Sequence, residues 1–244
     1  MSRLALLLLL ALAALPRPAA ADIVADVDEH LVGITTGFAG TRILVFGSID
    51  APGHVVVVVR GPSGPEKLYR KSPVLGVWVN SAALTFVQVP SFYAVASTGP
   101  LEEIASESER KRLHLGVDQL ELQAVGRVSE NLLREWRQAL VRAMERAQLY
   151  WTEPGEVLLL NDRLFRVTFE LPAAVSTGTY LVEAYLFEDG VAVAAQTLPL
   201  VVNKVGFEAA IYSFAQQQAP LYGLAAIVVA LLAGWIAHLI FRRE

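Results

Sequence analysis

The chain has no cysteine, and its 244 residues include only two methionines and four histidines. The missing thiol excludes a cysteine nucleophile, a disulfide framework, a zinc knuckle and covalent haem attachment. The sequence also has no glycine-rich phosphate loop, no Gly-x-Ser-x-Gly elbow and no paired-histidine metal motif. These absences favour a protein that is not an enzyme and that carries no cofactor. The four histidines are His30, His54, His114 and His238.

The chain also lacks an excess of positive charge, since 20 Lys and Arg residues face 24 Asp and Glu residues. Without a basic patch, neither nucleic acid nor anionic lipid is expected as a partner. No asparagine begins an Asn-x-Ser/Thr glycosylation site. Together with the absence of cysteine, this favours a bacterial periplasm over a eukaryotic cell surface.

An apolar run at the N-terminus, residues 4–15, is too short to span a bilayer comfortably. Arg3 precedes it, and a stretch rich in proline and alanine follows it up to Ala21. This order is typical of a secretory signal peptide, so residues 1–21 are predicted to be a signal that is cleaved after Ala21. An uncleaved anchor is the alternative. Cleavage would remove two arginines and no acidic residue, leaving a net charge of −6.

A second apolar run predicts a single transmembrane helix at residues 220–241, because residues 221–241 carry no charge. A helix of that length is ~31 Å long, which matches a hydrocarbon core of roughly 30 Å. Arg242 and Arg243 follow it, and the positive-inside rule places residues 242–244 in the cytoplasm. The sequence therefore predicts a single-pass protein of the bacterial inner membrane, with residues 22–203 in the periplasm.

Two stretches of the periplasmic part, residues 31–98 and 156–202, have the composition of β-strands. Residues 43–47, 55–59 and 84–89 are predicted strands, the last covered on both faces, and residues 61–65 are a predicted turn. Residues 164–171 alternate in polarity up to Pro172, and Asp189-Gly190 is a typical hairpin turn. The fold class expected is an immunoglobulin-like antiparallel sandwich, with two separate β lobes as the alternative.

Residues 100–150 are predicted to form a helical insertion between these β regions. The first helix starts at Pro100, has acidic residues early and basic residues late, and stops near Gly116. The second helix covers residues 129–150. Its apolar stripe, spaced by three and four residues, is Leu133, Trp136, Leu140, Met144 and Ala147.

Residues 204–219 connect the sandwich to the membrane helix. Phe207, Ile211 and Phe214 are spaced by four and three residues, which predicts an amphipathic helix. Such a helix would either lie at the lipid interface or pack on the domain.

The acidic stretch after the predicted cleavage site contains the only candidate metal ligands. Asp26, Asp28 and His30 would share one face of a strand, and two carboxylates with one imidazole can hold a divalent ion. A loose, solvated N-terminus is the alternative interpretation.

The aromatic residues Trp78, Phe92 and Tyr93 could line a pocket, although aromatic side chains in a sandwich usually belong to the core. Arg127 and Arg163 could bind an anion, although isolated arginines usually lie at the surface.

One face of the predicted membrane helix carries small residues. Ala226, Ala230 and Gly234 follow at intervals of four, and His238 extends the same face. Small residues allow close helix packing in lipid, so these four residues form a candidate packing interface with another membrane helix. General alanine-rich composition with an interfacial histidine is the alternative.

Several motifs in a fixed order resemble a family of alphaproteobacterial transmembrane proteins. They are Gly-Val-Trp-Val-Asn at 76–80, Pro-Ser-Phe-Tyr-Ala-Val-Ala-Ser at 90–97, Leu-Phe-Arg at 164–166, Tyr-Leu-Phe-Glu-Asp-Gly at 185–190, Lys-Val-Gly at 204–206 and Pro-Leu-Tyr-Gly at 220–223. The resemblance implies a periplasmic domain on one C-terminal membrane helix, with no established activity and no catalytic residue. It also implies an association with genes for sulfite-exporter-like permeases.

These observations predict a membrane-anchored periplasmic accessory protein that interacts with the lipid bilayer and with another inner-membrane protein. A permease is the preferred partner, because of the resemblance alone. The alternative is a periplasmic module that binds or senses a small ligand or a metal, and a hydrolase is the third hypothesis.

Overall fold

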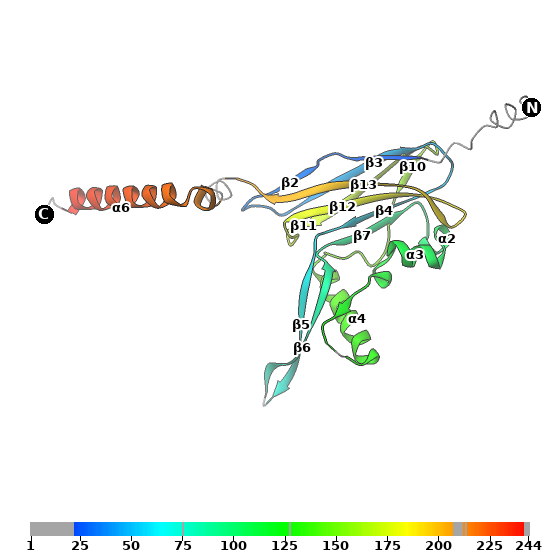
Figure 1. Cartoon of the computed structure of the whole chain (residues 1–244), viewed down its shortest axis with the longest axis horizontal. Helices are drawn as coiled ribbons and strands as arrows, with labels where there is room; N and C mark the ends of the chain where they lie inside the picture. Colours follow the sequence, from blue (N-terminus) through cyan, green and yellow to red (C-terminus); the bar gives the residue numbers. More distant parts are fainter. Residues whose placement is uncertain (1–21, 75, 127, 207–211, 213, 242–244) are drawn as a thin grey trace, which may run out of the picture.

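The computed structural model describes residues 22–74, 76–126, 128–206, 212 and 214–241. Two sheets face each other in a sandwich, from which a two-stranded arm and a single long helix project (Figure 1). The protein is mainly β with one C-terminal apolar helix, as the sequence predicts. The signal peptide predicted for residues 1–21 and the tail predicted for residues 242–244 lie outside the described residues.

The first sheet is antiparallel and has four strands in the order β1 (Ile23–Val27), β3 (Gly40–Ile49), β11 (Leu164–Pro172) and β10 (Leu158–Leu160). The alternation predicted for residues 164–171 is confirmed, because Phe165, Val167, Phe169 and Leu171 are buried and their neighbours Arg166, Thr168 and Glu170 are exposed. A side-chain period of two therefore turns one face of this sheet to the core.

The second sheet has six strands in the order β2 (Leu31–Ile34), β13 (Val191–Lys204), β12 (Gly178–Glu188), β4 (His54–Arg60), β7 (Tyr93–Ser97) and β9 (Gly155–Glu156). The β2–β13 and β7–β9 pairs are parallel, and the other pairs are antiparallel. The Asp189-Gly190 hairpin between β12 and β13 is confirmed.

One apolar core lies between these two sheets. Val45 and Phe169 reach it from the first sheet, and Val57 and Val182 reach it from the second. Both β regions of the sequence supply strands to both sheets, so the alternative of two separate β lobes is wrong.

A second core covers the outer face of the six-stranded sheet. Val56, Val58 and Tyr93 of that face pack there with the helical insertion, which contains α2 (Leu101–Ile104), α3 (Glu107–Leu113), the short helix η1 (Val117–Gln119) and α4 (Glu130–Arg146). The stripe predicted on the second helix faces this core, because Trp136 and Leu140 are buried. The strand β4 is a continuous valine run because both of its faces are covered.

The first predicted helix is in fact two helices. Ala105 is extended and forms a β-bridge with Gly190, and Ser106 caps α3 by accepting a hydrogen bond from the Glu109 backbone N–H. The bridge to the β12–β13 turn therefore interrupts a pattern that is locally helical. The helix α3 ends at Leu113, because the following residue, His114, has a left-handed φ of 49°; the stop predicted at Gly116 is therefore two residues late.

The arm consists of β5 (Ser63–Val74) and β6 (Val77–Pro90), with the short strand β8 (Gln123–Ala124) beside the base of β6. The turn predicted for residues 61–65 is wrong in part: β5 already begins at Ser63, and Pro65 is accommodated at a shift in register between Gly64 and Glu66. The prediction that residues 84–89 are covered on both faces is confirmed only in part. Leu84 and Phe86 are buried on one face, whereas Thr85 and Val87 on the other face are half-buried. The alternation breaks at exposed Gln88, which has a φ of 56°.

The C-terminal helix α6 (Ala219–Phe241) begins one residue before the predicted membrane helix and is long and apolar enough to cross a bilayer. Of the residues predicted to form the amphipathic connection, Phe207 and Ile211 lie outside the described residues. Phe214 is described, and its ring meets that of Tyr222 with a centroid separation of 6.3 Å.

Candidate functional site

The three candidate metal ligands do not converge on one point. Asp26 and His30 approach each other, with 3.3 Å between a carboxylate oxygen and the imidazole Nε2, and both side chains are exposed. Asp28 instead accepts hydrogen bonds from the backbone N–H groups of Glu29 and Leu44. Among the residues that the structure describes, no group of three or more acidic or histidine side chains is placed to hold a metal ion.

The alternative of a loose N-terminus is also wrong. Residues 23–27 form β1 at the edge of the first sheet, and Ile23, Ala25 and Val27 are buried in the core. A side-chain period of two buries these three apolar residues and leaves Asp26 in solvent.

The aromatic candidates separate into core and surface. Phe92 and Tyr93 are fully buried on opposite faces of the second sheet, so neither lines an open pocket. Trp78 lies at the far end of the arm and is 67% exposed. Of the two candidate anion-binding residues, Arg163 lies exposed in the turn before β11, and Arg127 is outside the described residues.

Tyr93 belongs to a cluster of polar contacts that connects the sandwich to the helical insertion. Its hydroxyl donates to the His114 carbonyl at 2.6 Å and accepts from the Gly116 N–H at 2.8 Å. Arg60 forms an ion pair with Glu183, donates to the Leu113 carbonyl at 2.5 Å and lies over the Tyr93 ring.

Burial raises the pKa of Tyr93 to about 12, against a smaller opposing effect of the Gly116 hydrogen bond. Burial also raises the pKa of Tyr150, which donates to the Pro90 carbonyl. Both phenols are therefore neutral donors at physiological pH. These contacts hold the backbone from Leu113 to Gly116 in place, so their role is structural.

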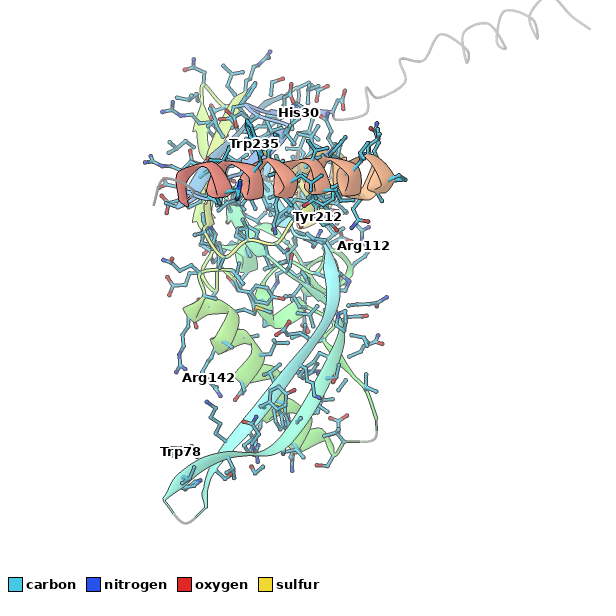
Figure 2. The ribbon with its side chains drawn as sticks, turned by 90° about the vertical axis from the view of Figure 1, so that its left-hand side faces the viewer. His30, Trp78, Arg112, Arg142, Tyr212 and Trp235 are labelled. Carbon is cyan, nitrogen blue, oxygen red and sulfur yellow. The ribbon has the colours of Figure 1, made fainter. Side chains whose placement is uncertain are left out.

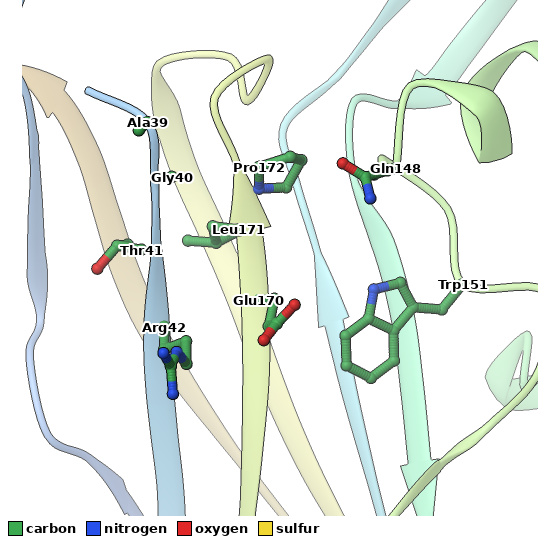
Figure 3. Close-up of a pocket in the computed structure, with 9 residues that line it drawn as sticks. All are labelled: Ala39, Gly40, Thr41, Arg42, Gln148, Trp151, Glu170, Leu171 and Pro172. Carbon is green, nitrogen blue, oxygen red and sulfur yellow. The ribbon is translucent and has the colours of Figure 1, made fainter. Parts of the chain in front are cut away.

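A shallow hollow of about 350 Å³ lies where the start of β3 and the end of β11 approach the segment after α4 (Figure 3). Arg42 and Glu170 are cross-strand neighbours on its floor, and the Trp151 ring faces them from the opposite wall (Figure 3). Both charged side chains are exposed, so the hollow can offer opposite charges and an aromatic face only to a ligand that remains partly in water.

The helix α6 presents its predicted packing face openly. Ala226, Ala230, Gly234 and His238 are all exposed, and a Cβ added to Gly234 would meet nothing within 4 Å. The described part of the chain therefore places nothing on this face.

The tip of the arm is the surface that the sequence analysis missed. Val77, Trp78 and Val79 are 40–67% exposed there, on a ribbon that projects away from both cores (Figure 2). Tyr69 is 53% exposed and lies nearer the base of the arm, opposite Ala83. A local signal was present in the sequence: no acidic residue occurs between Glu66 and Glu102, whereas three basic residues follow Glu66 within five positions.

Comparison with known proteins adds a family. The family described as "Putative transmembrane protein (Alph_Pro_TM)" matches residues 22–243. The chain belongs to this family. Membership agrees with the resemblance found in the sequence and, together with α6, indicates a membrane-anchored protein.

No curated protein matches this Alph_Pro_TM protein. Among solved structures, the Bacillus subtilis sporulation control protein Spo0M aligns with a TM-score of 0.28 and 9% identity, over 77% of this chain and 51% of that chain. The bacterial hydrophobin BslA aligns with a TM-score of 0.24 and 10% identity, over 78% of this chain and 100% of that one. Both likenesses are too distant to support an inference, and the chain spans about half the length of Spo0M.

Proposed function

We propose that this Alph_Pro_TM protein is a non-enzymatic accessory protein of the bacterial inner membrane, docked on another membrane protein. The observation that carries the proposal is the row of small residues on α6, where Ala226, Ala230 and Gly234 follow at intervals of four along one face of the helix. In lipid, such a face allows the backbones of two helices to approach closely, and van der Waals packing then drives association.

The proposed orientation places residues 22–203 in the periplasm and the C-terminus in the cytoplasm. It is supported by the signal-like sequence of residues 1–21 and by Arg242 and Arg243 directly after α6. In this orientation, the sandwich and the arm face the periplasmic side of the partner.

We further propose that the sandwich is immunoglobulin-like. The support is the strand order β1-β3-β11-β10 in one sheet and β13-β12-β4 in the other. If the strands β1, β3, β4, β10, β11, β12 and β13 are named A to G, these are the A-B-E-D and G-F-C orders of the immunoglobulin constant domain. The helical insertion then lies between strands C and D, and an experimental structure with another strand order would refute the assignment.

A permease of the sulfite-exporter type is the proposed partner, and its support is the gene association implied by the family resemblance. Gentle detergent extraction of native membranes, followed by crosslinking and mass spectrometry, would identify the partner directly. We expect one integral membrane protein to be recovered with the chain in a fixed ratio.

The role of the α6 face is tested by Gly234→Leu, with Val228→Phe on the opposite side of the helix as the matched control. Leucine at position 234 would hold the helices apart, so recovery of the partner should fall at least tenfold, whereas Val228→Phe should leave it unchanged. If only monomer is crosslinked in the unaltered protein, or if both variants behave alike, the accessory role is wrong.

The second candidate function is a periplasmic module that binds a small ligand. The hollow beside Arg42, Glu170 and Trp151 favours it, because it combines two opposite charges with an aromatic wall. A ligand that binds only the folded state raises the melting temperature. Sulfite, thiosulfate, sulfonates and divalent ions can be screened in this way, and a shift that Trp151→Ala abolishes would support the ligand site.

A further inference from the structure

The tip of the β5–β6 arm is apolar on both of its faces and has no core behind it. Val77 and Val79 point to one face and Trp78 to the other, because successive side chains of a strand alternate. Their exposed fractions are 63%, 40% and 67%, respectively. A lone two-stranded ribbon is only marginally stable in water, so these side chains are more stable where something covers them.

The same segment carries a local positive charge in a chain whose net charge is −4. Lys67, Arg70 and Lys71 lie on β5, and the stretch from Lys67 to Leu101 contains no acidic residue. Arg70 is within 3.0 Å of Glu135 on α4, but Lys67 lies over the ring of exposed Tyr69 at 5.1 Å. The net charge of the chain therefore conceals a basic and aromatic arm, which extends from Lys67 near its base, opposite Thr85, to Trp78 at its tip.

If α6 crosses a bilayer, the position of the arm places it near that bilayer. The arm leaves the half of the sandwich that is nearer to α6 and runs across the direction of that helix (Figure 1). Trp78 marks the end that is farthest from the sandwich (Figure 2). A membrane that α6 crosses would thus extend alongside the arm, and the anchor keeps the membrane surface at a high effective concentration.

We propose that the β5–β6 arm, from Lys67 to its tip, is a second membrane contact that lies in the headgroup region of an anionic bilayer. Trp78 at the tip and Tyr69 farther along the arm would occupy the interface, where aromatic rings with a polar atom are favoured. Lys67 and Lys71 would direct their ammonium groups to lipid phosphates while their alkyl chains cover apolar surface. This contact requires the membrane anchoring of the chain but not the proposed protein partner.

The ribbon also limits how deeply the tip can enter. The two strands pair along their length, from Ser63 opposite Pro90 to Val74 opposite Val77, but their outer edges keep unpaired backbone groups. Such groups are too costly to place in the hydrocarbon core, so the contact remains at the interface.

Lipid is a better occupant of this tip than a protein. A stable protein interface buries at least about 1,200 Å² in total, and a narrow ribbon end with three exposed apolar side chains offers little of that area. An interfacial lipid contact needs only a few apolar and basic side chains, since the anchor already holds the chain at the membrane.

The absence of cysteine makes a direct test simple. Val77→Cys places a unique thiol at the tip, and Glu103→Cys on α2 provides an exposed control far from it. Each full-length variant is labelled with a bimane dye and reconstituted at one copy per nanodisc. Phosphatidylglycerol discs and phosphatidylcholine discs are then compared, with a doxyl-lipid quencher at headgroup depth.

We expect the label at position 77 to be quenched several-fold more than the label at position 103 in phosphatidylglycerol discs. Replacing Lys67 and Lys71 by glutamine should lower the population in contact with lipid by about fivefold per charge. Trp78→Ser should lower it further, while circular dichroism shows that the fold is unchanged.

Equal quenching at positions 77 and 103 in phosphatidylglycerol would overturn the proposal. Quenching that appears only with several copies per disc would make a second copy the occupant and would also overturn it. Equally strong quenching in phosphatidylcholine would refute the assignment of the lysines to lipid phosphates. Because each disc holds only this protein and lipid, none of these results depends on the partner probed by Gly234→Leu.

Discussion

Replacing Tyr93 by phenylalanine should weaken the attachment of the helical insertion to the sandwich. The change removes one hydroxyl, which donates to the His114 carbonyl at 2.6 Å and accepts from the Gly116 N–H at 2.8 Å. The ring itself is fully buried and remains in place. Two partly buried backbone groups lose their partner, so the free energy of unfolding should fall by about 2 kcal/mol.

The effect of this substitution should also depend on pH. The pKa of Tyr93 is about 12 in the folded protein because the side chain is buried, whereas an exposed tyrosine has a pKa of about 10. The fold therefore favours the neutral phenol, and this stabilisation is complete below pH 10 and is lost as the pH rises through 12. At pH 11, the unaltered protein should have lost about 1.4 kcal/mol from this residue alone.

The assay is equilibrium urea unfolding of the full chain in mild detergent at pH 8 and pH 11. The difference between the unaltered protein and Tyr93→Phe should shrink from about 2 kcal/mol to about 0.6 kcal/mol. Tyr69→Phe is the matched control, because Tyr69 is 53% exposed on the arm, and it should change stability by less than about 0.5 kcal/mol. A difference that stays constant between pH 8 and pH 11 would refute the reasoning from burial.

Three further substitutions test the packing of the sandwich and of the insertion by the same unfolding assay. Phe169→Ala leaves a cavity at a fully buried site between the sheets, and the free energy of unfolding should fall by about 3–5 kcal/mol. Phe46→Ala, at an exposed position of β3, should lower it by less than about 1 kcal/mol. Equal losses of stability would contradict the assigned faces of the first sheet. Gly47→Ala would push a Cβ into the backbone of β1, and the free energy of unfolding should fall by about 1–3 kcal/mol. Gly64→Ala is the control, because its Cβ would meet nothing within 4 Å. If Gly47→Ala left the stability unchanged, β1 would not pair with β3 at this position. Ser106→Ala removes the cap of α3 and should cost about 0.5–2 kcal/mol, and no loss would show that the cap does not stabilise the insertion.

Patterns of short range were enough to predict much of the secondary structure. The alternation around Phe169 identified β11, the three- and four-residue spacing around Trp136 and Leu140 identified α4, and the Asp189-Gly190 pair identified the hairpin. These patterns work because each reflects the face of one element that is buried. The boundaries of α4 differ because Gln148, with a φ of 60°, turns the chain away before Tyr150.

Predictions that depended on distant neighbours were less successful. The residues around Ala105 have a helical sequence pattern, but Ala105 forms a β-bridge with Gly190, which lies 85 positions away in the chain. The candidate metal ligands share a sequence period, yet Asp28 is instead bonded to the backbone of Glu29 and Leu44. The exposure of Trp78 was not predicted, because a strand with aromatic residues usually belongs to the core. Only the pairing of the two strands of the arm shows that this strand projects from the sandwich.

The sequence by itself determined the membrane anchor, the missing thiol chemistry and the order of β regions around a helical insertion. These properties depend on composition and on runs of adjacent residues, which folding does not alter. Only the tertiary structure decided that both β regions share one sandwich, that Tyr93 holds the insertion in place and that Trp78 ends an exposed basic arm. The reason is that burial and pairing arise between segments far apart in the chain, and no local pattern records which segments meet.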